Sequence, residues 1–264
     1  MDLHLANRVI LVTGGSSGVG LAVVDDLLAA GARVATCARD LDRLAAATSA
    51  LTSHDPDRLL AVRCDVRRPS DVNAFVAAAH ARFGAVDGLV NNAGQSLMKS
   101  AADTTGAEWA SEFDLKIAGV MNLLQAARPH LAASDAGVMV NVNAVLARQP
   151  EPRLAATSAA RAALLNLTKT LSIDLAAEGI RVNSVLLGLI DTGQWRRRYD
   201  ERATDDGQSY EQWSADLAAD RGIVLGRLGT AAEVSFVITM LMSPRASYVT
   251  GTAIDVAGGV GRYV

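Results

Sequence analysis

The residues with the clearest chemical capacity form a glycine-rich turn, Thr13-Gly14-Gly15-Ser16-Ser17-Gly18-Val19-Gly20, directly after the apolar run Val9–Val12. Glycines let a backbone turn sharply and approach a pyrophosphate closely, and the start of the following helix supplies unpaired N–H groups and a positive dipole end. A tight strand–helix turn without any ligand is the alternative. Because the turn follows the first strand of a βαβ unit, its position favours phosphate binding.

The elements that must position this turn alternate between short β-type runs and longer helical patterns. The expected strands are Val9–Val12, Arg33–Cys37, Leu60–Cys64, Gly88–Val90, Val138–Val142, Arg181–Leu186 and Thr252–Val256. The expected helices are residues 19–28, Leu41–Ser53, residues 70–83, Glu108–Leu131, Ala159–Ala177 and Ala231–Met242. Parallel strands need helical crossovers on both faces of their sheet. We therefore predict an α/β fold, a Rossmann-type doubly wound parallel sheet of seven strands, in a single dinucleotide-binding domain over residues 1–264.

Residues 191–222 interrupt this alternation with a stretch rich in charge and with the aromatic residues Trp195, Tyr199 and Trp213. An insertion at the end of a strand could act as a lid or substrate loop, since such loops often bind ligands in α/β folds. An ordinary surface excursion of helices is the other interpretation.

Further short motifs recur along the chain. They are Cys64-Asp65-Val66, Asn91-Asn92-Ala93-Gly94, Arg181-Val182-Asn183-Ser184, Gly226-Arg227-Leu228-Gly229, Thr250-Gly251 and Gly258-Gly259. Together with the glycine turn, they resemble the short-chain dehydrogenase/reductase family in its compact single-domain form, over about the whole chain. The resemblance implies an oxidoreductase that binds a nicotinamide dinucleotide across the carboxyl ends of the strands and acts on a small alcohol or carbonyl.

The resemblance also implies which residues bind the dinucleotide. The phosphates would contact Gly14, Ser16, Ser17, Gly18 and Val19, and the adenine would contact Asp65 and Val66. The ribose and backbone region would lie beside Asn91, Ala93 and Gly94, with Arg161 holding ribose hydroxyls. The nicotinamide would lie beside Gly188, Ile190 and Thr192. Leu187 stands where the family has a proline.

The end of the second strand bears on the choice of dinucleotide. An NAD site places a carboxylate there on the ribose 2′-OH, whereas an NADP site must neutralise a 2′-phosphate, usually with arginine. Ala38 occupies the acidic position and Arg39 follows it. We predict NADP. The alternative is NAD, in which case Arg39 would be a solvated surface charge.

The family's catalytic serine, tyrosine, lysine and asparagine are all replaced. Ala144, Thr157, Arg161 and Lys116 occupy their positions in that order. The pKa of a tyrosine hydroxyl is about 10, whereas the pKa of a threonine hydroxyl is far higher and close to that of water. The difference corresponds to roughly 8 kcal/mol, so Thr157 is no like-for-like acid, and a guanidinium such as that of Arg161 does not give up its proton.

Lys116 is the replacement that could supply a proton, since lysine ionises near tyrosine and desolvation lowers its pKa. The hypothesis is that Lys116 is the general acid, with Asn143 or Thr157 orienting the substrate oxygen and Arg161 supplying positive charge. Alternatively, Lys116 points to solvent or satisfies a helix carbonyl. The loss of all four groups also fits a non-catalytic NAD(P)-binding sensor, an inactive partner subunit, or a non-redox lyase or isomerase.

Arginines near the expected substrate end could attract an anionic substrate, namely Arg148 and the run Arg196-Arg197-Arg198. A solvated charged face is the other interpretation of that run. Glu151 and Arg153 lie in a proline-bounded loop at the expected substrate rim. The histidines His4, His54, His80 and His130 show no metal-ligand spacing, so no metal is expected.

Composition excludes several other classes of protein. The 264 residues include 25 basic and 28 acidic side chains, with a net charge of −3, which does not suit a nucleic-acid binder that neutralises phosphates. A hydrophobic content of 50% excludes a disordered chain. Cys37 and Cys64 are too few for a disulfide framework and suggest a reducing compartment. Met1–Asn7 has no long apolar core, so we expect no signal peptide and a cytoplasmic protein without a membrane partner.

The helices Glu108–Leu131 and Ala159–Ala177 carry apolar residues on more than one side. The resemblance implies a homotetramer in which these two helices pack against a second copy, with a dimer as the smaller alternative. Burial of the same residues within one subunit is the other interpretation.

Overall fold

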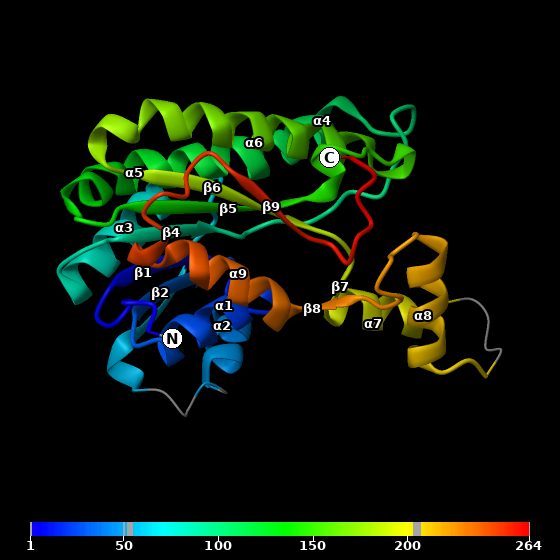
Figure 1. The fold of residues 1–264 in the computed structure, drawn as a ribbon, viewed down its shortest axis with the longest axis horizontal. Helices are drawn as coiled ribbons and strands as arrows, with labels where there is room; N and C mark the ends of the chain where they lie inside the picture. Colours follow the sequence, from blue (N-terminus) through cyan, green and yellow to red (C-terminus); the bar gives the residue numbers. More distant parts are fainter. Residues whose placement is uncertain (1, 50, 52–54, 203–206, 264) are drawn as a thin grey trace.

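The structure, a computed structural model, describes residues 2–49, 51, 55–202 and 207–263. A sheet of seven strands in the order β3-β2-β1-β4-β5-β6-β9 forms its centre (Figure 1). Every neighbouring pair runs parallel. The strands are β1 (Val9–Thr13), β2 (Arg33–Ala38), β3 (Leu59–Arg63), β4 (Gly88–Asn91), β5 (Val138–Ala144), β6 (Arg181–Leu187) and β9 (Ala253–Val256). The predicted doubly wound α/β fold is therefore confirmed.

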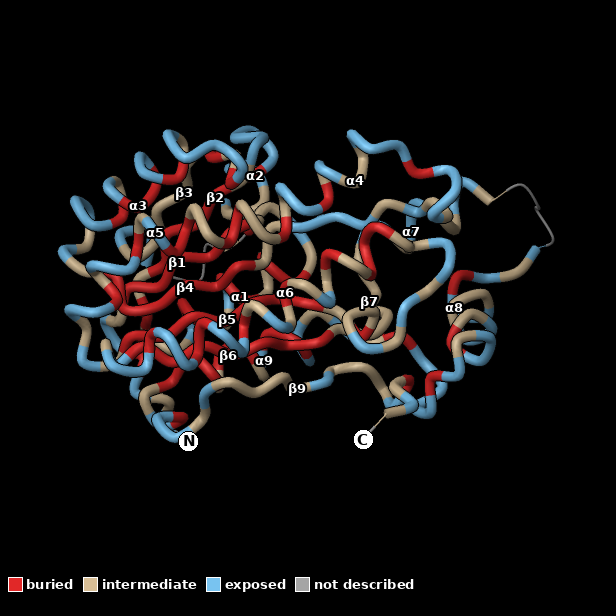
Figure 2. The backbone as a smooth tube through the Cα atoms, turned by 90° about the horizontal axis from the view of Figure 1, so that it is seen from above, coloured by how far each residue is buried: buried red, intermediate tan, exposed pale blue. Residues whose placement is uncertain are grey.

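Helices cover both faces of this sheet. One face packs against α1 (Gly18–Ala29) and α9 (Ala231–Met242), and the other against α3 (Pro69–Phe83), α5 (Gly119–Ala133) and α6 (Ala155–Asp174). Buried residues lie mainly in the strands and on the inner sides of these helices (Figure 2). Strand β1 is buried along its whole length, as expected for a parallel strand covered on both faces.

Several expected elements differ in detail from the structure. The single helix Glu108–Leu131 is divided into α4 (Gly106–Phe113), a π-helical turn over Asp114–Ala118, and α5. Apolar residues recur near i+4 in the sequence on both sides of this turn, so the sequence pattern does not reveal it. The helix expected over Ala159–Ala177 begins earlier, as α6, and ends at Asp174.

The helix expected over Leu41–Ser53 is α2 (Leu41–Ser49), and residues 50 and 52–54 lie outside the described part of the chain. Two further strands, β7 (Ile190–Asp191) and β8 (Gly229–Thr230), form a separate parallel pair that the sequence did not predict. Elements of two residues are too short to show a hydrophobic period.

The region 191–222 contains α7 (Gly193–Asp200) and α8 (Tyr210–Asp220), with residues 203–206 outside the description. Both helices lie beyond one end of the sheet, next to β7 and β8 (Figure 1). The rings of Trp195, Tyr199, Tyr210 and Trp213 contact one another at centroid distances of 5.4–6.3 Å and join the two helices. No described helix has the length and apolarity that crossing a bilayer requires.

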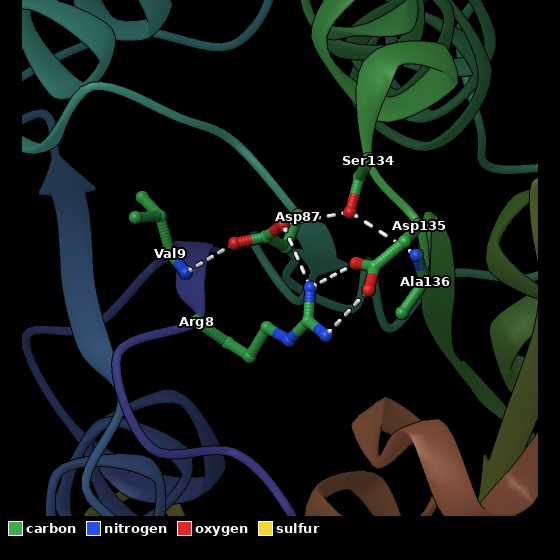
Figure 3. Close-up of polar contacts among 6 residues, drawn as sticks. All are labelled: Arg8, Val9, Asp87, Ser134, Asp135 and Ala136. Atoms are coloured by element: carbon green, nitrogen blue, oxygen red, sulfur yellow. Dashed lines mark hydrogen bonds and ion pairs between the residues drawn. The ribbon is translucent and has the colours of Figure 1, made fainter.

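At the amino ends of the strands, a polar cluster connects three segments of the chain (Figure 3). Asp87, just before β4, accepts hydrogen bonds from the backbone N–H of Val9 at 2.8 Å and from the Ser134 hydroxyl at 2.6 Å. Arg8 lies 3.4 Å from the Asp87 carboxylate and also pairs with Asp135. The cluster fastens β1, β4 and the loop before β5 at the edge opposite the glycine turn.

Candidate active site

The glycine turn connects β1 to α1 at the carboxyl edge of the sheet. Gly14 and Gly18 have φ values of +74° and +55°, a left-handed conformation that favours glycine. A Cβ on Gly20 would lie 2.3 Å from the carbonyl oxygen of Gly14, so the turn has no room for a side chain there. Ser17 precedes α1 without capping it by a side-chain hydrogen bond. The first N–H groups of the helix therefore have no side-chain cap, as phosphate binding requires.

A cleft of about 1080 Å³ runs past this turn along the carboxyl edge. It is lined by all but one of the residues expected to bind the dinucleotide: Gly14, Ser16, Ser17, Gly18, Val19, Arg39, Asp65, Val66, Ala93, Gly94, Arg161, Gly188, Ile190 and Thr192.

Asn91 is the exception. It is 5% exposed, its side-chain amide donates to the Asn141 side chain at 2.8 Å, and it is absent from the cleft wall. The next residue, Asn92, lines the cleft instead and donates to the carbonyl of Thr13 at 2.9 Å. Asn92 rather than Asn91 therefore lies at the cleft, because β4 extends through Asn91 into the sheet interior.

Arginines gather at the end of the cleft next to β2. Arg39 and Arg43 both line it, and neither forms a side-chain ion pair within the described residues. Arg67 instead holds the carboxylate of Asp65 through two bonds of 3.0 and 2.6 Å, and the hydrogen bond from this guanidinium lowers the pKa of Asp65 to about 2. Sequence reasoning missed Arg43 and Arg67; the position of Arg43 in the first turn of α2, four residues after Arg39, was the available signal.

Two of the four positions that the resemblance assigns to catalysis, Lys116 and Thr157, lie in a buried polar network behind the cleft. Lys116, 2% exposed, donates to the carboxylate of Glu112 at 2.7 Å. The hydroxyl of Thr157 donates to the same carboxylate oxygen and accepts from the backbone N–H of Leu97 at 2.9 Å. Neither Lys116 nor Thr157 lines the cleft. Lys116 therefore points neither to solvent nor to a helix carbonyl: its partner is Glu112, a residue that the sequence analysis did not single out.

Burial of the ammonium is the main cause that lowers the pKa of Lys116 from 10.5 to about 8. The positive charge of Arg161 acts in the same direction, whereas Glu112 opposes it. Lys116 follows Glu112 by one turn, across the junction with the π-helical turn, and this i,i+4 relation lets the two side chains meet.

Arg161 extends from α6 into the cleft wall. One terminal nitrogen donates to the carbonyl of Val142 at 2.7 Å, and its Nε is buried without a hydrogen-bond partner among the described residues. The other terminal nitrogen would lie 3.4 Å from a Cβ on Gly94, which shows how closely the guanidinium approaches that loop. Burial lowers the pKa of Arg161 to about 10, which leaves it charged at neutral pH.

Asn143 and Ala144 complete this part of the wall. The Asn143 amide donates to the backbone carbonyl of Arg161 at 3.0 Å, and its oxygen accepts from the N–H of Ala144 at 2.9 Å. Both polar atoms of Asn143 are thus engaged with the backbone, which leaves little of this side chain to orient a substrate.

The three arginines of the run 196–198 have different surroundings in the structure. Arg197 and Arg198 line the cleft, whereas Arg196 lies over the ring of Tyr210 at 4.0 Å and does not. Arg148 pairs with Asp255, and the expected rim residue Glu151 pairs with Arg221 from the end of α8.

A parallel doubly wound sheet, with a glycine turn at the start of α1 and a long cleft across its carboxyl edge, defines a dinucleotide-binding α/β fold. A family model described as enoyl-(acyl carrier protein) reductase matches residues 14–261. The chain belongs to the short-chain dehydrogenase/reductase family.

Among solved structures, a short-chain oxidoreductase from Pseudomonas aeruginosa PAO1, described as containing an atypical catalytic center, is 46% identical, with a TM-score of 0.95 and coverage of 98% of this chain and 99% of that chain. Its NADPH-bound structure is 45% identical, with a TM-score of 0.93 and the same coverage. A curated relative, 2-(R)-hydroxypropyl-CoM dehydrogenase from Xanthobacter autotrophicus, is 35% identical over 96% of this chain and 98% of its own.

Proposed function

We propose that this protein is an NADPH-dependent oxidoreductase that interconverts a small alcohol and its carbonyl compound. The observation that carries the proposal is the continuous cleft from Arg39, past the glycine turn, to Arg161. The similarity to an NADPH-bound oxidoreductase with an atypical catalytic center supports both the cofactor and the unusual site.

The described residues fit NADP along the whole cleft. The start of α1 would hold the pyrophosphate, and Arg39 with Arg43, which line the cleft, would hold the 2′-phosphate. Arg161 lines the cleft, and its guanidinium could donate to a hydroxyl or carbonyl oxygen of the ligand. When bound, the cofactor supplies or accepts the hydride.

The chain's own residues hold charge and a proton beside that end of the cleft. Arg161 stays protonated and stabilises negative charge on the substrate oxygen. Lys116, whose pKa is about 8, remains our candidate for the proton source. Because its ammonium lies behind the wall, we propose that Glu112 and the Thr157 hydroxyl connect it to the cleft, where Leu97 joins Thr157 to a lining loop.

Titration with NADPH and NADH tests the cofactor. We expect tighter binding of NADPH, and Arg39→Ala should weaken NADPH binding by about tenfold or more while leaving NADH binding unchanged. Arg33→Ala, at the opposite end of the same strand, is the matched control. Failure of the wild-type protein to bind either dinucleotide would overturn the proposal.

Turnover with a panel of aldehydes and ketones at pH 6–9 tests the reaction. Lys116→Met should abolish most of the turnover while NADPH binding persists. Unchanged turnover in this variant would remove Lys116 from the mechanism.

A second candidate function is a non-catalytic NADP-binding sensor or inactive partner subunit. The specific observation in its favour is that two of the four replacement residues, Lys116 and Thr157, are absent from the cleft wall. NADPH binding without turnover of any carbonyl would favour this candidate. Gain of turnover in the triple variant Ala144→Ser, Thr157→Tyr, Arg161→Lys would indicate a reductase that has lost its catalytic groups.

We also propose a cytoplasmic homotetramer. Two observations support it: both described cysteines are free thiols, and Ile173 on α6 and Phe113 on α4 expose 66% and 37% of their surface. Light scattering coupled to sizing chromatography measures the assembly directly, and a monomeric mass would contradict it.

A further inference from the structure

The substrate end of the cleft holds an arginine whose charge is not balanced by any carboxylate that the structure describes. Arg198 on α7 is partly buried, and its guanidinium lies 4.5 Å from the centre of the Trp195 ring. One terminal nitrogen donates to the sulfur of Met98 at 2.8 Å. A thioether is a weak acceptor, so it leaves the five-donor fork of a guanidinium largely unsatisfied.

Neighbouring arginines add further positive charge at this end of the cleft. Arg197 lines the same end of the cleft and forms no ion pair within the described ranges. Arg221 is close enough to lower the pKa of Arg198, although burial contributes more. Glu151, the one carboxylate among the residues that line this wall near α8, is already paired with Arg221. The wall therefore carries more positive than negative charge in a partly desolvated place, where unpaired charge is costly.

The position of Arg198 relates it to the reaction. Met98 follows Leu97, whose N–H donates to Thr157, so the arginine contacts the loop next to the replaced catalytic positions. Apolar side chains also line the cleft, namely Leu146, Leu154 and Trp195. This arrangement suits a substrate with its carbonyl near Arg161, a short apolar linker, and a charged group at α7.

We propose that Arg198 and its neighbours form an anion subsite, so that the substrate is an alcohol or carbonyl compound bearing a sulfonate, phosphate or carboxylate group. The inference rests on the proposed oxidoreductase function and names its substrate class. A guanidinium fork matches all three oxyanions through paired hydrogen bonds.

Calorimetric titration tests the subsite without relying on turnover. Ethanesulfonate, inorganic phosphate and acetate are titrated into the protein saturated with NADP⁺, so that the cofactor's own phosphate sites are occupied. The neutral probe is ethyl methyl sulfone. We expect at least one anion to bind and the sulfone not to bind, and the strongest anion identifies the group.

Arg198→Met should weaken anion binding by about ten- to hundredfold, and Arg198→Lys should restore part of it. Arg196→Met is the matched control, because Arg196 is on the same helix but stacks on Tyr210 outside the cleft. Turnover of acetoacetate relative to its methyl ester should show the same preference, with the loss in Arg198→Met falling on the anionic substrate alone.

Equal binding of anions and sulfone, or an equal loss in Arg196→Met and Arg198→Met, would overturn the anion subsite. These outcomes are distinguishable from failure of the oxidoreductase itself. If NADP⁺ does not bind but the anion still requires Arg198, the proposed function is wrong while the anion site stands.

Discussion

Among single residues, Glu112 connects two of the positions that the resemblance assigns to catalysis. It is 3% exposed and is the common acceptor for Lys116 and Thr157. Removing one partner of a buried ion pair leaves an uncompensated charge, which is strongly destabilising, whereas replacing both partners together is often tolerated. Stability measurements must therefore treat Glu112 and Lys116 as a pair.

The depressed pKa of Lys116 predicts an unusual pH dependence of stability. Below pH 8, lysine is protonated in both states, and the folded protein bears the full cost of the buried charge. Between pH 8 and 10.5 the unfolded chain binds more protons, so the free energy of unfolding should rise with pH, by at most about 3 kcal/mol. Urea denaturation at a series of pH values measures this rise.

The double variant Glu112→Gln/Lys116→Met serves as the reference, because it lacks both ionisable groups. We expect the difference in unfolding free energy between wild type and this variant to shift in favour of the wild type as the pH increases through that range. A constant difference would contradict the assigned pKa.

The sequence predicted most of the residues that line the cleft, but not which side chains contact one another behind it. The glycine turn and Arg39 could be predicted because local spacing fixes their place at the ends of strands. Glu112 could not, since its role depends on Thr157, which is brought near by the packing of α4 against α6. The only local signal was the four-residue spacing of Glu112 and Lys116 on one helix.

At the scale of elements, the junction between β1 and α1 determines the shape of the cleft. Some glycines of this fold lie too close to other backbone atoms to carry a side chain, whereas other glycines have open space around them. Gly20 would place a Cβ against backbone, whereas Gly106 at the start of α4 has nothing within 4 Å.

Gly20→Ala should therefore destabilise the fold by about 1–3 kcal/mol, because the clash involves a carbonyl that cannot rotate away. Dinucleotide binding should fall with it, since the same carbonyl belongs to the phosphate turn. Gly106→Ala is the matched control, with an expected change of no more than about 1 kcal/mol, in the stabilising direction. Guanidinium denaturation compares the two, and similar losses would contradict the steric argument.

Helix and strand types were largely predictable from periodicity, and the failures have physical causes. The apolar spacing near i+4 continues from α4 into α5, which hides the π-helical turn between them. Gly84 correctly predicted the end of α3. Its φ is +80° in the structure, a left-handed conformation that favours glycine. The pairing of β7 with β8 depends on residues far apart in the chain and had no local pattern.

Across the whole molecule, the carboxyl and amino ends of the strands carry different features. The carboxyl edge carries the cleft, while the amino edge carries the Asp87 cluster (Figure 3). Asp87 is 9% exposed and accepts from both backbone and side chain, whereas the Asp135 side chain is 77% exposed.

Asp87→Asn should cost about 1–3 kcal/mol in unfolding free energy, because an amide cannot accept every bond that the carboxylate accepts. Asp135→Asn should cost less than about 1 kcal/mol, as is usual for an exposed ion pair. Both variants should keep the wild-type affinity for NADPH, since the cluster lies at the far edge from the cleft. A loss of NADPH affinity in the Asp87 variant alone would show that the two edges are coupled.

The shared carboxylate of Glu112 also constrains how such a site can arise or revert. Changing Lys116 alone leaves a buried anion, and changing Thr157 alone removes a hydroxyl that this anion accepts from. A single change at either of these two positions therefore passes through a less stable protein. Lineages carrying this arrangement should retain or exchange these three residues as a block, so that intermediate combinations are rare in any set of descendants.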